Sequence, residues 1–217
     1  MVTKIVLTVV YALLVLTLVI LKAFKIGSRR RGVVKMLTAS MFVGIAIYGC
    51  ILQQGNLDIV LAVGLIFAAL GDLLLVFMDR HSFFDAGVVS FAVASTVISA
   101  YGIAYFGFSW WMILPFALFV ATTVICQVTK LYSFGRDIVY LNVYTLCIGL
   151  CGSVGIAVAC TFGGVKAILF GIGSFMYMLS DVCLGLFLLK FKKVGLDIVN
   201  TLLYFPGMLL IALSLLF

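Results

Sequence analysis

The sequence has very little charge, and this scarcity excludes an ordinary soluble domain. Charged residues make up 10% of the 217 residues, whereas 66% are hydrophobic. A soluble fold of this size keeps a largely polar surface, which so few polar side chains are unable to cover. The chain also has a single histidine and no glutamate, so aspartate is its only acidic side chain. Lipid is therefore the predicted solvent for most of the protein.

Long polar stretches are absent as well, and the short breaks that exist divide the chain into segments of membrane-spanning length. A spanning helix needs about 20 apolar residues. We predict an all-α fold, an integral membrane bundle of about eight transmembrane helices that forms one domain over residues 1–217. The predicted helices lie near residues 4–24, 33–52, 57–78, 83–106, 109–131, 138–160, 165–189 and 197–217.

Two features bear on individual helices. No small-residue cleavage site follows the first segment, so we interpret it as a retained helix and not as a signal peptide. The chain has only two prolines, Pro115 and Pro206. Both fall inside predicted spans, where we expect bends that neighbouring helices accommodate.

The basic residues gather on one side of the predicted bundle. Twelve of them lie in or beside alternate loops: Lys22, Lys25, Arg29, Arg30, Arg31, Lys35, Arg80, Lys130, Arg136, Lys190, Lys192 and Lys193. Only Lys4 and Lys166 fall on the other side. The positive-inside rule places the basic loops in the cytoplasm and both termini outside. The short chain without extensions fits a bacterial cytoplasmic membrane, and an internal eukaryotic membrane is the alternative.

The same rule accounts for the net charge of +7. Membrane lipids are therefore expected partners, and nucleic acid is not. The run Arg29–Arg31 is interpreted as a topology signal rather than a phosphate site. Oligomeric state is not predicted.

Metal and redox chemistry have little support in the sequence. The six cysteines lie in or at the ends of apolar spans, and none forms a Cys-x-x-Cys pair. Cys147 and Cys151 would share a helix face, but the lone histidine, His81, lies in a predicted loop. We predict no metal and no cofactor.

Two of the seven aspartates differ from the rest because they lie inside predicted spans. Helix ends, with solvation or capping, account for the other five: Asp58, Asp79, Asp85, Asp137 and Asp197. Asp72 and Asp181 have no such explanation, and a carboxylate at membrane depth marks a candidate functional site. A structural role, hydrogen-bonded to a neighbouring helix or paired with Lys35, is the alternative.

Depth along the helices brings other polar side chains to the same level. Counted from the predicted cytoplasmic ends at about 1.5 Å per residue, Asp72 lies about 9 Å deep and Asp181 about 12 Å deep. Lys35 lies at the cytoplasmic end of the second predicted helix. Four further polar residues fall roughly 5 to 11 Å deep by the same count: Asn142, Tyr144, Asn200 and Tyr204. We predict that these side chains line a shared pocket; hydrogen bonding between helices is the alternative for the four taken singly.

Three motifs together resemble a known family. They are GDLLL around Asp72, SFMYMLSDVCLG around Asp181, and YFPGMLLIALS near the end of the chain. In this order they are similar to the lysoplasmalogenase-like, or YhhN, family of eight-helix membrane proteins. The resemblance implies hydrolysis of the vinyl ether bond of a lysoplasmalogen, a lysophospholipid, to a fatty aldehyde and a glycerophospho-alcohol. It also implies that Asp72 and Asp181 are the central polar residues, with Lys35, Tyr144 and Tyr204 at matching places.

The chain departs from the family pattern at three positions. Ser95 stands where the family usually has histidine, Met208 where it has glutamine, and Met36 where proline commonly follows the lysine. These departures bear on substrate choice and on activity.

Two acids and no metal suit the implied reaction. Hydrolysis of a vinyl ether begins with protonation of the alkene carbon and passes through an oxocarbenium ion, as between the two carboxyl groups of a glycosidase. We predict that Asp72 and Asp181 share the acid and base roles, with no assignment of which is which. Two other functions stay open, a proton-coupled transporter and a non-catalytic lysolipid-binding protein.

Overall fold

The computed structural model describes residues 2–77, 80–129 and 138–217, and within these ranges its regular secondary structure is entirely helical. Its α-helices are α1 (Val2–Ala23), α2 (Ser28–Gln53), α3 (Asn56–Val76), α4 (His81–Phe106), α5 (Ile113–Val128), α6 (Ile138–Thr161), α7 (Val165–Leu186) and α8 (Val194–Ser214). A short 3₁₀ turn, η1 (Trp110–Met112), precedes α5, and a π-helical turn, η3 (Phe187–Phe191), follows α7. Each of the eight α-helices lies in a segment long and apolar enough to cross a membrane. The predicted all-α membrane bundle is confirmed.

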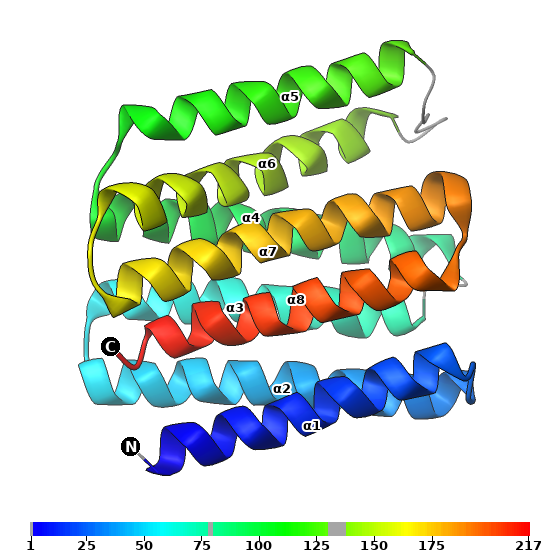
Figure 1. Cartoon of the computed structure of the whole chain (residues 1–217), viewed down its shortest axis with the longest axis horizontal. Coiled ribbons are helices and arrows are strands. Elements are labelled where there is room, and N and C mark those ends of the chain that lie inside the picture. The colour runs from blue at the N-terminus through cyan, green and yellow to red at the C-terminus, as the bar shows by residue number, and fades with distance from the viewer. Residues whose placement is uncertain (1, 78–79, 130–137) are drawn as a thin grey trace.

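The helices form two layers that lie side by side (Figure 1). One layer contains α1, α8, α7, α6 and α5, and the other contains α2, α3 and α4, with α2, α3 and α4 packed in sequence order. Both termini lie at one end of the bundle, here called the terminal end. The α1–α2, α3–α4 and α7–α8 connections lie at the opposite end, here called the basic end. Which end faces the cytoplasm stays a prediction.

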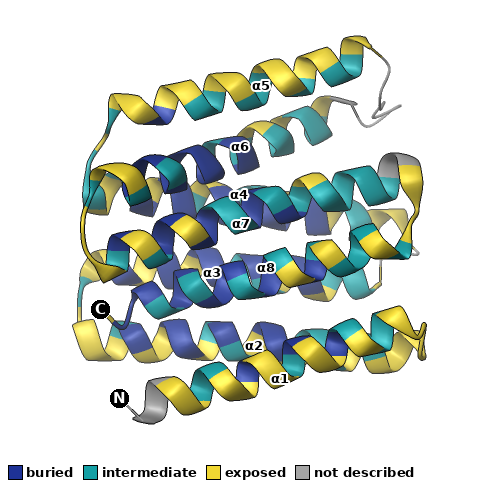
Figure 2. Cartoon of the chain, in the orientation of Figure 1, coloured by how far each residue is buried: buried dark blue, intermediate teal, exposed yellow. Residues whose placement is uncertain are grey.

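Helix α5 lies at the edge of the bundle, where it packs on α6 and on the preceding η1 turn. It has no buried residue, unlike α4, α6 and α7, whose inner faces form much of the core (Figure 2). The outer surface of the bundle carries large apolar side chains on most helices. Such a surface is the one expected for contact with lipid.

Small residues let α7 and α8 cross closely. A Cβ atom at Gly173 would lie 2.7 Å from the carbonyl oxygen of Gly207, and one at Gly207 would lie 2.9 Å from the carbonyl oxygen of Gly173. Both obstacles are backbone atoms, which have no rotamer that moves them away. Close backbone approach at small residues is typical of packing between transmembrane helices.

Two sequence expectations about the helices need correction. Helix α2 begins at Ser28, five residues before the prediction, so Arg29, Arg30 and Arg31 form its first turn and not a loop. No helix breaker separates Ser28 from the apolar run, and arginine is a good helix former. Pro115 lies in the first turn of α5, where its missing N–H has no partner to lose.

Asp58 was assigned to solvation or capping, and the structure contradicts this. The residue is only 4% exposed. Its Oδ1 accepts hydrogen bonds from Lys166 Nζ at 3.2 Å and from the Tyr101 hydroxyl at 3.3 Å. Lys166 also lies over the Tyr105 ring, 4.0 Å from its centroid. This buried ion pair joins α3 to α7 near the terminal end, and sequence spacing gave no sign of it because the partners are 108 residues apart.

Asp85, near the start of α4, has a more exposed environment. Asp85 is paired with His81 at 2.9 Å, one turn away on α4, and accepts a hydrogen bond from Tyr140. Asp79 and Asp137 lie outside the described residues.

The close crossing of α7 and α8 makes a testable prediction. Gly173→Ala is expected to force the two backbones apart and to destabilise the protein by roughly 2 kcal/mol, the usual scale of overpacking. Gly44→Ala is the matched control, because a Cβ atom there meets nothing within 4 Å. The melting temperature of each variant is measured in detergent, with size-exclusion chromatography used to monitor the loss of folded protein on heating. Equal melting temperatures for the two variants would contradict the proposed packing constraint.

Candidate functional site

An ion pair between α2 and α3 holds the first predicted aspartate. Lys35 Nζ lies 3.0 Å from Asp72 Oδ1, and the Asp72 side chain is only 3% exposed. Lys35 also lies 3.4 Å from the Asp72 carbonyl oxygen. The other carboxylate oxygen, Oδ2, is buried and has no hydrogen-bond partner among the described residues. The pair therefore compensates the charge of Asp72 and leaves one oxygen available.

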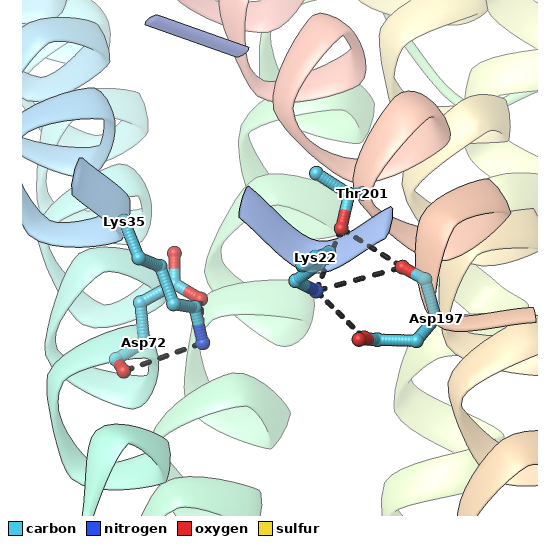
Figure 3. A network of polar contacts seen from close by, with 5 residues as sticks. All are labelled: Lys22, Lys35, Asp72, Asp197 and Thr201. Carbon is cyan, nitrogen blue, oxygen red and sulfur yellow. Dashed lines mark hydrogen bonds and ion pairs between the residues drawn. The ribbon is translucent and has the colours of Figure 1, made fainter. Parts of the chain in front are cut away.

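A second ion pair lies alongside the first and joins α1 to α8 (Figure 3). Lys22 Nζ is 2.6 Å from Asp197 Oδ1 and donates a hydrogen bond of 2.7 Å to the Thr201 hydroxyl. Sequence reasoning missed this pair. Lys22 was counted as a topology signal and Asp197 as a helix cap, and each interpretation is consistent with its position in a terminal turn. Only the tertiary contact shows that the two side chains meet.

A group of aromatic side chains surrounds Tyr204, which lines the same cavity as the Lys35–Asp72 pair. The Tyr204 ring makes edge contacts with Phe91 and Tyr177, with centroids 6.0 and 5.8 Å apart. The Tyr204 hydroxyl is buried and, like Asp72 Oδ2, has no described partner within hydrogen-bond distance, although these two groups lie close enough to interact with each other. Ser95 donates to the Tyr177 hydroxyl at 3.1 Å. Ser95 is thus linked to Tyr204 through Tyr177.

Asp181 on α7 has different surroundings from Asp72. Its Oδ2 accepts a hydrogen bond from the Tyr144 hydroxyl of α6. Within the part of the chain that the structure describes, no lysine or arginine forms an ion pair with it. Asp72 therefore has a lysine cation as its partner, whereas Asp181 has the phenol hydroxyl of a tyrosine.

Both aspartates line one cavity at the basic end, with a volume of about 270 Å³. Its walls come from α1, α2, α3, α4, α7, η3 and α8. The charged and polar residues in those walls are Lys22, Ser28, Arg31, Lys35, Asp72, Asp181, Asp197, Asn200, Thr201 and Tyr204. The predicted convergence of polar groups in one layer holds for most of the residues named from sequence.

A second cavity, of about 340 Å³, lies between α4, α5, α6 and α7. It is lined mainly by apolar side chains, including Phe84, Val88, Phe119 and Ile148. Five residues line both cavities: Leu75, Phe91, Asp181, Leu184 and Leu188. Asp181 therefore lies where a polar cavity meets an apolar one.

The structure places the seven predicted site residues as follows. Asp72, Lys35, Asn200 and Tyr204 line the polar cavity, Tyr144 lines the apolar cavity, and Asp181 lines both. Asn142 is not among the lining residues of either cavity. It accepts a hydrogen bond of 2.7 Å from Gln127, which ties α6 to α5.

This arrangement permits acid and base chemistry on an amphipathic molecule. The polar cavity offers cations and hydroxyl groups, and the apolar cavity offers room for a hydrocarbon chain. Asp181 at the junction and the free oxygen of Asp72 would face the boundary between the two parts of such a ligand.

The Lys35–Asp72 pair makes a prediction about stability. Lys35→Met leaves Asp72 buried without its cation and is expected to cost about 3 kcal/mol, as for other broken buried pairs. The double variant Lys35→Met/Asp72→Asn removes both charges and is expected to recover much of that loss. Thermal melts of the two single variants and the double variant form a double-mutant cycle. Additive losses in the double variant would show that the two side chains do not interact.

Comparisons with known proteins give one match. No curated protein and no solved structure matches the chain. The model of the YhhN family matches residues 30–215, which leaves α1 and Lys22 outside the match. The match includes α2 to α8, and so both aspartates, Lys35, Tyr144 and Tyr204. The chain belongs to the YhhN family.

Proposed function

We propose that the protein is a membrane-embedded hydrolase that cleaves the vinyl ether bond of lysoplasmalogens. The observation that carries the proposal is that Asp181 lies at the junction of a polar cavity and an apolar cavity, with Asp72 in the same polar wall. A lysolipid has the matching form, since its scissile bond lies between a polar glycerophospho-headgroup and one hydrocarbon chain.

The surroundings of the two aspartates support an assignment of roles. Asp72 is the carboxylate, because Lys35 at 3.0 Å compensates its charge. Asp181 carries the proton, because a neutral acid is the less costly form of a carboxyl group that lacks a cation at membrane depth. Asp181 then donates its proton to the alkene carbon that lies beyond the ether carbon. This forms a C–H bond and leaves an oxocarbenium ion.

The second half of the reaction restores both groups. The free Oδ2 of Asp72 stabilises the positive charge of the oxocarbenium ion. Water attacks the cationic carbon and gives its proton to the Asp181 carboxylate, while Tyr144 keeps that side chain oriented. The resulting hemiacetal breaks its carbon–oxygen bond to the glycerol, releasing a fatty aldehyde and the glycerophospho-alcohol. One water is consumed and no oxidant is needed.

Substitution of the two aspartates tests this proposal. With purified protein and a lysoplasmalogen, Asp181→Asn is expected to lower the rate of aldehyde release at least about 100-fold, because general acid catalysis commonly contributes that much. Asp72→Asn is expected to do the same by removing electrostatic stabilisation of the cation. Asp85→Asn is the matched control, since Asp85 lies on α4 and lines neither cavity.

Two outcomes would overturn the proposal. The first is aldehyde release at the normal rate by both Asn variants. The second is equal cleavage of the saturated ether analogue, which lacks the alkene carbon that Asp181 protonates.

The position of the hydrocarbon chain makes a separate prediction. Gly185 lines the apolar cavity, and a Cβ atom there meets nothing within 4 Å. Gly185→Leu is therefore expected to fill the cavity without disturbing the helices, raising KM for a long-chain substrate about 10-fold. Gly44→Leu is the control, because Gly44 lies on α2, away from the cavity, and a Cβ atom there also meets nothing within 4 Å. Unchanged kinetics in Gly185→Leu would exclude this cavity as the chain site.

A further inference from the structure

The first turn of α2 contains an unusual concentration of positive charge. Arg29, Arg30 and Arg31 follow one another at the N-terminus of the helix, and no acidic residue lies in that turn. The N-terminus of a helix already carries a partial positive charge, so cations there are unfavourable unless an anion compensates them. The N-cap residue, Gly27, provides no side chain for the free N–H groups. Within its own first turn, α2 therefore has no anion that compensates these cations.

Arg31 differs from its two neighbours because it reaches the polar cavity. Arg29 and Arg30 are exposed, whereas Arg31 is half-buried and lines the cavity together with Ser28 and Gly32. Its Nε atom is buried and has no hydrogen-bond partner among the described residues. An unsatisfied buried donor of a charged group is costly, which suggests a ligand atom as its partner.

The charges of the cavity wall show which cation is available. Lys22 is paired with Asp197, and Lys35 is paired with Asp72. In the part of the chain that the structure describes, Arg31 forms no ion pair. If Asp181 is protonated, as the proposed function requires, Arg31 is the uncompensated charge of the cavity.

Two buried atoms that do not belong to the helix end also indicate a ligand. Tyr204 is 5% exposed and Asp72 is 2% exposed, and both line this cavity. The Tyr204 hydroxyl and Asp72 Oδ2 have no described partner within hydrogen-bond distance. The two groups do lie close enough to interact with each other. Native proteins rarely leave such groups unsatisfied. The cavity thus contains unsatisfied groups both at the helix end and at the level of Asp72.

We propose that the Arg31 side chain, together with the free backbone N–H groups at the start of α2, binds the phosphate group of the lysolipid headgroup. Arginine and helix N-termini are both preferred partners of phosphate, through forked hydrogen bonds and free backbone N–H groups respectively. The proposal rests on the proposed function for the position of the scissile bond. The phosphate site itself does not depend on turnover.

The spacing along α2 agrees with the dimensions of such a lipid. Arg31 is four residues before Lys35, which places it about 6 Å farther toward the basic end. In a lysoplasmalogen, four single bonds join the phosphate ester oxygen to the ether oxygen, about 5 Å when extended. A phosphate at Arg31 therefore places the ether oxygen at the level of the Lys35–Asp72 pair.

Binding of uncleavable ligands tests the site independently of catalysis. The probes are a saturated 1-alkyl lysophosphoethanolamine and the corresponding 1-alkylglycerol, which lacks the phosphate. In lipid nanodiscs, Arg31→Gln is expected to weaken binding of the phosphate-containing ligand about 10-fold and to leave binding of the alkylglycerol unchanged. Unchanged binding of the alkylglycerol also shows that the variant is folded. Arg29→Gln, an exposed neighbour in the same turn, is the control and is expected to bind both ligands normally.

Arg31→Lys gives a second measure. Lysine keeps the charge but lacks the planar fork of arginine, so it is expected to recover part of the lost affinity. Equal weakening of both ligands by Arg31→Gln would show a structural role for Arg31 and overturn the proposal, as would unchanged binding of the lysophospholipid.

Competition distinguishes a lipid phosphate from a free one. Glycerophosphoethanolamine is expected to displace the lysophospholipid at a lower concentration than inorganic phosphate. The reverse order would assign the site to free phosphate and overturn the lipid assignment. Loss of binding in Arg31→Gln, with no aldehyde released by the unmodified protein, would support the phosphate site while rejecting the hydrolase.

Discussion

In a hydrocarbon environment, a buried carboxylate needs a cation or hydrogen-bond donors within reach, and the Lys35–Asp72 pair meets this need at the centre of the site. The pair joins α2 to α3 and leaves one carboxylate oxygen free. Lys22 and Asp197 repeat the arrangement between α1 and α8. Together these contacts hold four helices around a polar cavity that the surrounding apolar surface would otherwise close.

The two ends of the bundle differ in how completely their buried polar groups are satisfied. Near the terminal end, Asp58 accepts hydrogen bonds from both Lys166 and Tyr101, and Lys166 also packs on an aromatic ring. At the basic end, Asp72 and Tyr204 each keep an unpaired oxygen, and Arg31 keeps an unpaired nitrogen. Buried polar groups without partners are rare in native proteins and call for an explanation, and a ligand in the cavity would supply one. We therefore place the proposed site at the basic end.

The departures from the family pattern acquire a structural meaning. Ser95 is buried and hydrogen-bonded to Tyr177, which packs against Tyr204, and to the carbonyl oxygen of Phe91, so it contacts residues that shape the cavity. Met208 is fully buried, one turn along α8 from Tyr204. Neither side chain lines the polar cavity. The aspartates, the lysine and the two tyrosines implied by the family remain around the cavities without them.

The sequence by itself determined the solvent, the number of helices and the layer in which Asp72, Asp181, Lys35 and Tyr204 meet, because hydropathy and helical rise are local properties. For Asn142 the structure shows the stated alternative, a hydrogen bond between helices, with Gln127 as the partner. The partner of Asp58 is 108 residues away and could not be predicted from spacing. Only the tertiary structure decided which charges are paired, which cavity each aspartate faces, and that Arg31 enters the site. Those properties depend on side-chain direction and on contacts between distant helices, and spacing along the chain does not encode them.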